Sequence, residues 1–297
     1  MGTAIALGNF DGVHNAHRQL IEKMLAFARK RKTESIVYVF EPHPRFLLCP
    51  SAPPALLMET DLKVRRLIEI GADRVVLEKR GLDVLSLTPR EFVEKILVEE
   101  LGAVYVTAGF NYRFGKNAKG DAETLKTLCK EYGITCEIME SVCEAGAPVS
   151  STRLRTLLAE GDVKTVNALS FAPYTLLGTV QEGKKLGRSI GFPTLNVPLS
   201  ENLLLPKKGV YISETRILNK VYKSVTNIGQ NPTVEKALPR AESYLLGFDA
   251  EVYGEKAEIT LLDFLRPETK FDSVEALRRQ IEKDTEETRL YFERKDM

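Results

Sequence analysis

The spacing of strand-like and helix-like segments changes once along this 297-residue chain, and that change constrains the fold most. Up to about Ala172, short apolar runs alternate with helical patterns, as is typical of a parallel sheet covered by helices. Beyond it, turn residues become dense and strand-like segments follow one another directly. The second pattern favours an antiparallel β domain, and closure into a barrel would remove its exposed edges.

The first half predicts a parallel sheet with helices on both faces. In such a sheet ligands bind beyond the carboxyl ends of the strands, so functional residues are expected in the loops that follow them. The expected strands are 3–7, 35–40, 74–77, 104–108 and 135–139. The helical patterns cover 17–31, 61–70, 89–101 and 121–132.

The second half predicts an antiparallel barrel and one terminal helix over 273–292. Its expected strands are 174–180, 209–217, 221–228, 243–248 and 257–264. The length of the chain fits two domains that each bury a core. We therefore expect an α/β plus β architecture, with a Rossmann-like parallel-sheet domain at 1–172 and a β-barrel domain at 173–297.

Composition excludes several classes of protein. The formal net charge is +1, which gives no support for a protein that coats nucleic acid or a membrane surface. No apolar run is long enough to span a membrane, and the first residues lack the pattern of an export signal. The spacing of Cys49, Cys129, Cys136 and Cys143 matches no common zinc site and predicts reduced thiols. We expect a cytoplasmic protein.

The turn after the first expected strand is a candidate phosphate site. Gly8 and Gly12 let the backbone turn tightly, and the helix that follows presents free amides to an anion. His14 and His17 are three residues apart, so they share a face of that helix and can donate hydrogen bonds to phosphate oxygens. A pair of surface histidines is one alternative. Another is half of a metal site with Asp11 and Glu41 as further ligands, although a glycine-rich helix start favours anions.

Two later loops carry polar groups at the same predicted edge. His43 lies in the segment Phe-Glu-Pro-His-Pro, whose prolines predict an extended loop. Asn111 and Arg113 lie among aromatic residues in 109–116, a combination that suits a flat ring plus a phosphate. The alternative for this second loop is a hydrophobic cap on the domain.

A helix start follows at Ser151. The hydroxyl groups of Ser151 and Thr152 are typical helix caps. Arg155 comes within one turn of them, so this helix start is a second candidate anion site.

Together these segments resemble the adenylyltransferase half of bacterial bifunctional FAD synthetases (riboflavin kinase/FMN adenylyltransferases). The matching motifs, in the family's order, are G-x-F-D-G-x-H-x-x-H, F-E-P-H-P, G-x-N-x-x-F-G and S-S-T-x-x-R. Ala16 stands where the family usually has glycine, and a small residue is kept. The resemblance therefore identifies the first half as a nucleotidyltransferase domain.

The resemblance also implies roles for these residues. ATP would lie over Gly8, Phe10, Asp11 and Gly12, with His14 and His17 at its phosphates and Ser151, Thr152 and Arg155 at its far end. The flavin would contact His43, Asn111 and Arg113. The FMN phosphate itself would attack the α-phosphorus and expel pyrophosphate, with a magnesium ion accompanying ATP. Catalysis would then consist of positioning and charge stabilisation.

A basic, glycine-dense segment opens the second half. Gly183, Gly187, Arg188 and Gly191 lack the Walker order but can wrap a nucleotide with backbone amides. The alternative is a flexible hairpin with solvated lysines.

The residues after this segment resemble the P-T-A-N signature of riboflavin kinases, with Leu195 in place of alanine. The resemblance implies that Thr194 and Asn196 hold magnesium and ATP phosphates. It also implies that Glu242 is the base that takes the proton of the ribityl 5′-hydroxyl, whereas seen alone it could be an exposed carboxylate at a strand start. The pair Gln230-Asn231 departs from the family pattern, and no glycine occurs in 235–240.

The sequence therefore predicts a bifunctional enzyme that phosphorylates riboflavin to FMN and then adenylylates FMN to FAD. Its expected substrates are ATP, riboflavin and FMN. One rival is a single-activity adenylyltransferase whose barrel only binds flavin, and another is a non-catalytic flavin sensor.

Overall fold

The computed structural model describes residues 2–183, 187, 190–229 and 239–296, and its packing divides into two compact units. Unit 1 comprises Met1–Leu56 and Thr60–Ser151, and unit 2 comprises Leu57–Glu59 and Thr152–Met297. None of the helices that the structure describes combines the length and apolar character that a membrane crossing needs.

Unit 1 is built on a five-stranded sheet in the order β3-β2-β1-β4-β5, and all of its pairings are parallel. The prediction of a parallel sheet is confirmed. The central strand is almost wholly apolar because both of its faces are buried. The strands are β1 (Thr3–Leu7), β2 (Glu34–Phe40), β3 (Arg74–Glu78), β4 (Ala103–Gly109) and β5 (Thr135–Met139).

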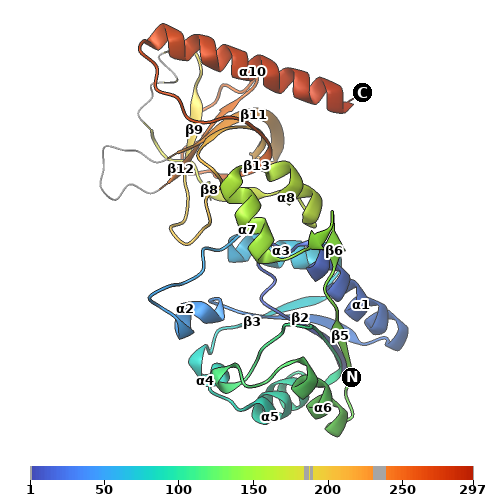
Figure 1. Ribbon diagram of the computed structural model, residues 1–297. Helices are drawn as coiled ribbons and strands as arrows, with labels where there is room; N and C mark the ends of the chain where they lie inside the picture. The colour runs from blue at the N-terminus through green and yellow to red at the C-terminus, as the bar shows by residue number, and fades with distance from the viewer. Residues whose placement is uncertain (1, 184–186, 188–189, 230–238, 297) are drawn as a thin grey trace. The chain divides into compact units, whose positions relative to one another are not determined.

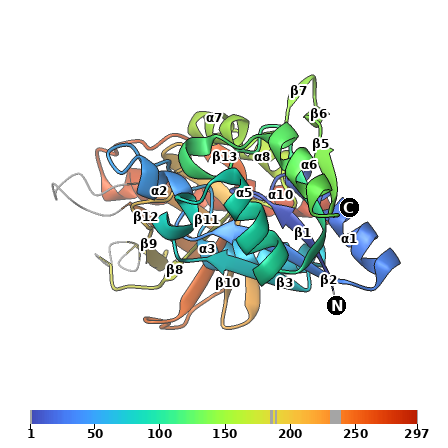
Figure 2. The same cartoon turned by 90° about the horizontal axis from the view of Figure 1, so that it is seen from below.

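Helices cover both faces of this sheet (Figures 1 and 2). In Figure 1, α1 and α3 lie above the sheet, and α4, α5 and α6 lie below it. The bounds in unit 1 are α1 (Asn15–Arg31), α2 (Pro44–Leu48), α3 (Thr60–Ile70), α4 (Leu82–Leu85), α5 (Pro89–Glu91), its π-helical continuation (Phe92–Glu100), a 3-10 turn (Lys116–Ala118), α6 (Ala122–Glu131) and the hairpin of β6 (Cys143–Glu144) and β7 (Ala147–Pro148).

Local sequence explains where these helices begin and end. Thr88 and Glu91 form a reciprocal capping box at the start of α5. The carboxylate of Asp121 accepts the backbone N–H of Thr124 and caps α6. Gly71 follows α3 with φ +121°, a conformation that side chains rarely adopt. The expected helix over 89–101 forms as α5 and its π-helical continuation.

Unit 2 contains a six-stranded antiparallel sheet in the order β8-β13-β10-β11-β12-β9. Its end strands β8 and β9 contact each other, so the sheet is a nearly closed barrel. At this contact a Cβ on Gly178 would lie 2.4 Å from Val197 Cγ1, so glycine permits the close approach. The strands are β8 (Thr175–Thr179), β9 (Thr194–Pro198), β10 (Gly209–Ile217), β11 (Lys220–Gly229), β12 (Arg240–Leu245) and β13 (Lys256–Arg266).

Two strands differ from their expected positions. β9 was not expected from the pattern, because Pro193 and Pro198 bracket it closely. β12 begins three residues before the expected strand, since it pairs with both β11 and β9 and the ladder extends toward its start. Gly247 follows with φ +73° and turns the chain away from the strand that was expected to continue there.

Among the residues that the structure describes, three helices lie in unit 2 apart from Ser151, the first residue of α7, which belongs to unit 1. The first two, α7 (Ser151–Glu160) and α8 (Val163–Leu169), precede the barrel, and α10 (Val274–Asp296) follows it. α8 packs on β13, where the Asn167 side chain donates to the carbonyl of Leu261 at 2.9 Å. The expected boundary at 172/173 therefore falls after two helices that pack with unit 2. As a division of function it stays a prediction.

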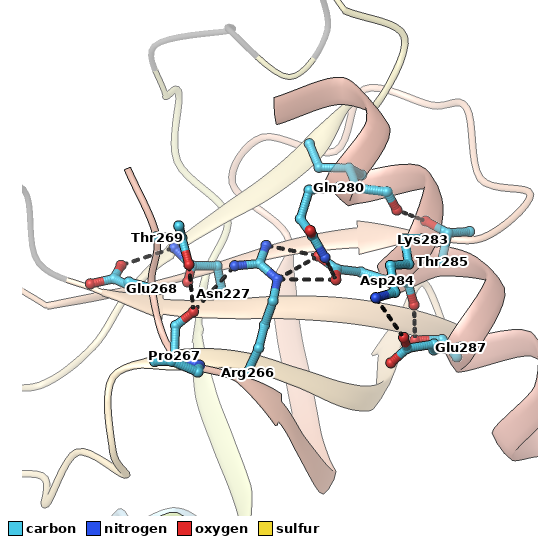
Figure 3. A network of polar contacts seen from close by, with 12 residues as sticks. Asn227, Arg266, Pro267, Glu268, Thr269, Gln280, Lys283, Asp284, Thr285 and Glu287 are labelled. Carbon is cyan, nitrogen blue, oxygen red and sulfur yellow. Dashed lines mark hydrogen bonds and ion pairs between the residues drawn. The ribbon is translucent and has the colours of Figure 1, made fainter. Parts of the chain in front are cut away.

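A polar network fixes α10 to the barrel (Figure 3). The Arg266 guanidinium donates to both carboxylate oxygens of Asp284, which is 3% exposed, at 2.8–3.1 Å. Gln280 donates to the same carboxylate at 2.8 Å. Apolar contacts of Phe292 with Ile212 and Leu262 complete the attachment. A partly buried ion pair with this many hydrogen bonds holds the helix in one position.

A line of buried hydroxyl groups runs across β10, β11 and β12. All five side chains are fully buried, and neighbouring oxygens along the line are 2.6–2.8 Å apart. In order, the line is Thr215, Ser224, Ser213, Thr226 and Ser243. Each oxygen has a hydrogen-bond partner, so burial of these polar groups is compensated.

Candidate active sites

The loop between β1 and α1 has an unusual backbone. Phe10, Gly12 and Val13 all have positive φ values, of 49°, 84° and 35°. Such values are rare for residues with a side chain, and they persist where the surroundings over-determine them, often at functional sites. Phe10 and Val13 are held by complete burial. A Cβ on Gly8 would lie 3.1 Å from the Phe10 ring, so this loop also favours glycine at position 8.

His14 and His17 are in direct contact at the start of α1. Their rings stack with centroids 3.6 Å apart and an angle of 12° between planes. His14 caps the helix, because its Nδ1 accepts the backbone N–H of His17 at 3.3 Å. An Nδ1 that accepts leaves the proton on Nε2, so neutral His14 can still donate one hydrogen bond to a ligand.

Both imidazoles are neutral near pH 7. Burial lowers the pKa of His14 from 6.5 to about 4. The pKa of His17 is lowered well below 6.5, mainly by burial and further by the charges of His14 and Lys63. The His17 Nδ1 is buried and has no hydrogen-bond partner in the described part of the chain. These groups therefore offer hydrogen bonds without carrying a positive charge.

The loop of β1 also contacts the start of α7. The hydroxyl of Ser151 donates to the backbone carbonyl of Asp11 at 2.7 Å. Ser151 is the last residue of unit 1, so this contact lies within that unit and places Ser151 beside the first motif. Thr152 and Arg155 follow on α7 and are part of unit 2.

His43 does not lie in a purely extended loop. The Glu41–Pro42 peptide is cis, and α2 begins directly afterwards with His43 as its N-cap. The His43 Nδ1 accepts the N–H of Arg45 at 3.2 Å. The expectation of no helix here was wrong, because Pro44 occupies the first helical position, where a fixed φ and a missing donor are tolerated.

The aromatic residues of the 109–116 loop fit both interpretations, since one is part of the hydrophobic cap and another is exposed where it could contact a ligand. Phe114 is buried and packs against Phe92 and Tyr112, so it belongs to the core. Phe110 is 55% exposed, beside the exposed side chain of Asn111. Arg113 is exposed and pairs with the half-buried Asp121 at 3.4 Å.

The loop residues gather at one edge of the sheet. His14, His43 and Asn111 follow β1, β2 and β4, which are parallel, so all three lie at the carboxyl edge as expected. Within the described ranges no cluster of three or more His, Cys, Asp or Glu side chains could hold a metal ion. The alternative of a histidine metal site completed by Asp11 and Glu41 therefore finds no support there.

The candidate kinase residues form one row across the barrel. Asn227, Glu242 and Asn196 are successive cross-strand partners on β11, β12 and β9, so their side chains share a face. Thr194 is opposite Tyr244 in the same ladder and lies on that face too. The structure thus brings together the residues that the sequence placed in one site.

Hydrogen bonds fix this row. The Asn196 Nδ2 donates to Glu242 Oε1 at 3.4 Å, and Arg240 Nη1 donates to Asn196 Oδ1 at 3.2 Å. These two contacts define which end of the Asn196 amide faces Glu242. Asn196 is buried, whereas Glu242 and Thr194 are exposed. A carboxylate held by a buried amide yet open to solvent can accept a proton from a ligand.

The glycine segment lies against this row. A Cβ on Gly183 would be 2.6 Å from Asn196 Nδ2, and one on Gly187 would be 2.3 Å from the Phe192 carbonyl. Gly191 has φ +89°. These positions require glycine for close approach or backbone conformation. Arg188 and the pair Gln230-Asn231 lie outside the described residues.

Two residues of these sites, Arg240 and Lys63, were not singled out from the sequence, and Asn227 was noted only as part of a segment that follows the riboflavin kinase order. Arg240 and Asn227 each have a buried polar atom, Nε and Oδ1, without a partner in the described part of the chain. Lys63 on α3 is 3% exposed. One signal was available for Lys63, because it lies four residues before Leu67 and so shares the apolar face of α3.

Two family models match the chain, one over each half. The FAD synthetase family matches residues 1–153, and the riboflavin kinase family matches residues 170–292. The first match covers the loop of the two histidines, and the second covers the row of Thr194, Asn196 and Glu242.

Full-length relatives show the same combination. The bifunctional riboflavin kinase/FMN adenylyltransferase of Listeria monocytogenes is 36% identical over 292 residues, which cover 97% of this chain and 92% of the relative. The Escherichia coli K12 protein of the same name is 35% identical, with 98% and 93% covered. A Streptococcus pneumoniae crystal structure, described as a macrolide-efflux protein, matches with a TM-score of 0.88 and 31% identity, over 97% of this chain and 94% of that one.

These similarities extend over both halves of the chain. They include the histidine loop of the first half and the row of Thr194, Asn196 and Glu242 in the second half. The chain therefore belongs to the family of bifunctional riboflavin kinase/FMN adenylyltransferases.

Proposed function

We propose that residues 1–172 carry the FMN adenylyltransferase activity of this family and that residues 173–297 carry its riboflavin kinase activity. The enzyme phosphorylates riboflavin to FMN with ATP and adenylylates FMN to FAD with release of pyrophosphate. The observation that best supports the assignment is the hydrogen-bonded row of Glu242 and Asn196 in one unit, with the stacked histidines in the other. The substrates and products are small molecules, and we expect the enzyme to work in the cytoplasm.

In the adenylyl transfer, an oxygen of the FMN phosphate attacks the α-phosphorus of ATP, and pyrophosphate leaves. Negative charge grows on the leaving group, so donors that are already in place lower the barrier. His14 offers its Nε2 proton, because its Nδ1 accepts the N–H of His17, and the N–H groups in the first turn of α1 that make no helical bond are further donors.

Other residues would position the two substrates. The backbone of Gly8, Phe10, Asp11 and Gly12 would surround ATP, with Ser151, Thr152 and Arg155 at its far end. His43, Asn111 and Arg113 would face the flavin, and the exposed ring of Phe110 is free to stack on it.

In the phosphoryl transfer, Glu242 accepts the proton of the ribityl 5′-hydroxyl as that oxygen bonds to the γ-phosphorus of ATP. The bond between the γ-phosphorus and the β–γ bridging oxygen breaks, and ADP leaves. The Asn196 amide holds the carboxylate in place, and Arg240 in turn holds the amide. The glycine segment of Gly183, Gly187, Arg188 and Gly191 would enclose the nucleotide.

Enzymes of both families use ATP with a divalent metal ion, and we propose Mg²⁺. The Thr194 hydroxyl and the Asn196 amide oxygen are hard donors of the kind that Mg²⁺ prefers, and the amide oxygen keeps a lone pair after accepting from Arg240. Few protein ligands are needed, because Mg²⁺ keeps waters and phosphate oxygens. Bound there, the ion would neutralise charge on the transferring phosphate.

The test is an assay of the purified enzyme with riboflavin, ATP and Mg²⁺, in which FMN and FAD are separated and quantified. Both products should form, with FMN first. A protein that makes FAD only from added FMN would be a single-activity adenylyltransferase, and one that binds flavin without turnover would be a sensor. His14→Ala should slow FAD formation roughly a hundredfold by loss of one donor, with FMN formation nearly unchanged.

A further inference from the structure

Lys63 is a buried cation beside the nucleotide loop. It projects from the buried face of α3, with Leu62 and Leu67 as buried neighbours on that helix. α3 packs against α1, the helix that begins with the two histidines (Figure 1). The Thr60 hydroxyl donates to the Glu41 carboxylate, which ties the first turn of α3 to the loop after β2.

The ammonium group of Lys63 lacks a close partner. Within the described part of the chain it forms no hydrogen bond or ion pair. Lysine is almost never fully buried unless it is paired, because removing its charge from water is costly. Burial lowers the pKa of Lys63, and the carboxylates of Asp11 and Glu41 partly counteract that effect. A lysine whose residue is only 3% exposed, and on which just two carboxylates act from further away, is typical of a site that binds an anion.

The charges around the loop show why an anion would need this lysine. Asp11 and Glu41 are close enough to affect the pKa of Lys63, and a phosphate chain would be repelled by both carboxylates. His14 and His17 are neutral and cannot offset that repulsion. Lys63 influences the pKa of His17, so it lies near the donors themselves. A cation in this position would supply the charge that the histidines lack.

We propose that the Lys63 ammonium pairs with the phosphate chain of ATP in the N-terminal site and keeps this pairing with the pyrophosphate that leaves. The inference rests on the proposed placement of adenylyl transfer at His14 and His17. In the absence of nucleotide, the carboxylates of Asp11 and Glu41 offset part of the lysine's charge. When ATP binds, its phosphate chain supplies the negatively charged partner of the Lys63 ammonium.

The first test is Lys63→Met, which keeps the length and apolar stem of the side chain but removes its charge. Truncating one partner of a buried charge pair should raise the KM for ATP in FAD formation, and the inhibition constant of inorganic pyrophosphate, by on the order of a hundredfold. The KM for FMN should stay within a few-fold. The KM for ATP in riboflavin phosphorylation gives a reference within the same molecule and should not change. Lys30→Met removes an exposed ammonium from α1 and serves as the matched control.

Two results would overturn the proposal. One is a Lys63→Met enzyme whose ATP and pyrophosphate constants stay within threefold of the parent. The other is an equal loss of affinity for FMN and ATP together with a lower unfolding temperature, which would mean that Lys63 only supports the fold. If the parent makes no FAD, or if His14→Ala has no effect on FAD formation, the proposed site fails instead.

A measurement on the unsubstituted enzyme covers the case in which Lys63→Met does not fold. Lysine Cε NMR signals report the pKa of each ammonium, and Lys63→Arg identifies the Lys63 signal by its absence. Addition of inorganic pyrophosphate should raise the pKa of Lys63 by about one pH unit or more, because a bound anion favours the charged form. An unchanged pKa at saturating pyrophosphate would contradict the pairing.

Discussion

Glu242 is the residue on which the kinase assignment most depends, and its surroundings permit a clean substitution. Glu242→Gln keeps the oxygen that accepts from Asn196 but removes the ability to take a proton. General-base assistance contributes on the order of a hundred to ten thousand in rate. FMN formation should fall by that factor, whereas adenylylation of added FMN should be unaffected. A variant that phosphorylates riboflavin within a few-fold of the parent would exclude this role.

His14 makes the stability of the enzyme depend on pH. Its pKa is about 4 in the folded state, below the ordinary value of 6.5, so the unfolded chain binds the proton more readily between these values. Stability from this group is therefore present above pH 6.5 and is lost as the pH falls toward 4. The loss amounts to about 3 kcal/mol.

His14→Asn removes the titrating group and keeps a good helix cap. Urea unfolding of the parent and this variant should be compared at several pH values between 7 and 4. The difference in their free energies of unfolding should change by about 3 kcal/mol in favour of the variant as the pH falls. If the free energies of unfolding of the parent and the variant depend on pH in the same way, His14 does not titrate with a lowered pKa.

Sequence motifs identified most candidate residues, because glycines, histidines and the P-T-x-N pattern stand out by type and order. The burial of a side chain and its cross-strand partners cannot be read from the sequence in this way. Arg240 matters only because β12 places it beside Asn196, a pairing between strands far apart in the sequence. Lys63 shares the apolar face of α3 with Leu67, but only the packing of the helix shows that Lys63 is buried. Residues whose role comes from tertiary position were therefore missed.

Among the elements, the hydroxyl line of the barrel gives a direct test of buried polar packing. Thr226 hydrogen-bonds to both Ser213 and Ser243. Thr226→Val keeps the shape but leaves both neighbours short of a partner. The free energy of unfolding should fall by about 1–3 kcal/mol.

Thr179→Val is the matched control, since Thr179 is exposed on β8. The control should change stability by less than about 0.5 kcal/mol. If both variants are equally stable in thermal or urea unfolding, the buried line contributes nothing net.

Most elements were predictable because strand and helix periodicities are local. The runs at Thr3–Leu7, Thr135–Met139 and Gly209–Ile217 have the expected bounds. The missed elements are short, and each depends on context. β9 is a strand because β12 lies beside it, and α8 is a helix of two turns that is stabilised by packing on β13.

At the scale of the whole molecule, the two activities should be separable. A fragment of residues 1–172 should make FAD from supplied FMN, and residues 173–297 should phosphorylate riboflavin. The packing of α8 refines this expectation. A fragment that begins at residue 152 keeps the Asn167 bonds to Leu261 and Tyr174 and the ion pair of Lys164 with Asp263.

The fragment 152–297 should therefore unfold at a higher temperature than 173–297 and show at least equal kinase activity. Thermal unfolding and FMN formation measure the two properties. Two folded fragments that are both inactive would mean that residues from each half share one site.

The hydroxyl line has a further consequence for hydrogen atoms. Each of its oxygens can act as donor or acceptor, so the protons along Thr215, Ser224, Ser213, Thr226 and Ser243 can point in either direction without moving a heavy atom. The two orderings have opposite dipoles. An electric field that changes at the barrel surface, as when a charged phosphate arrives, would favour one ordering over the other. The interior of the barrel can thus become polarised while its backbone stays still.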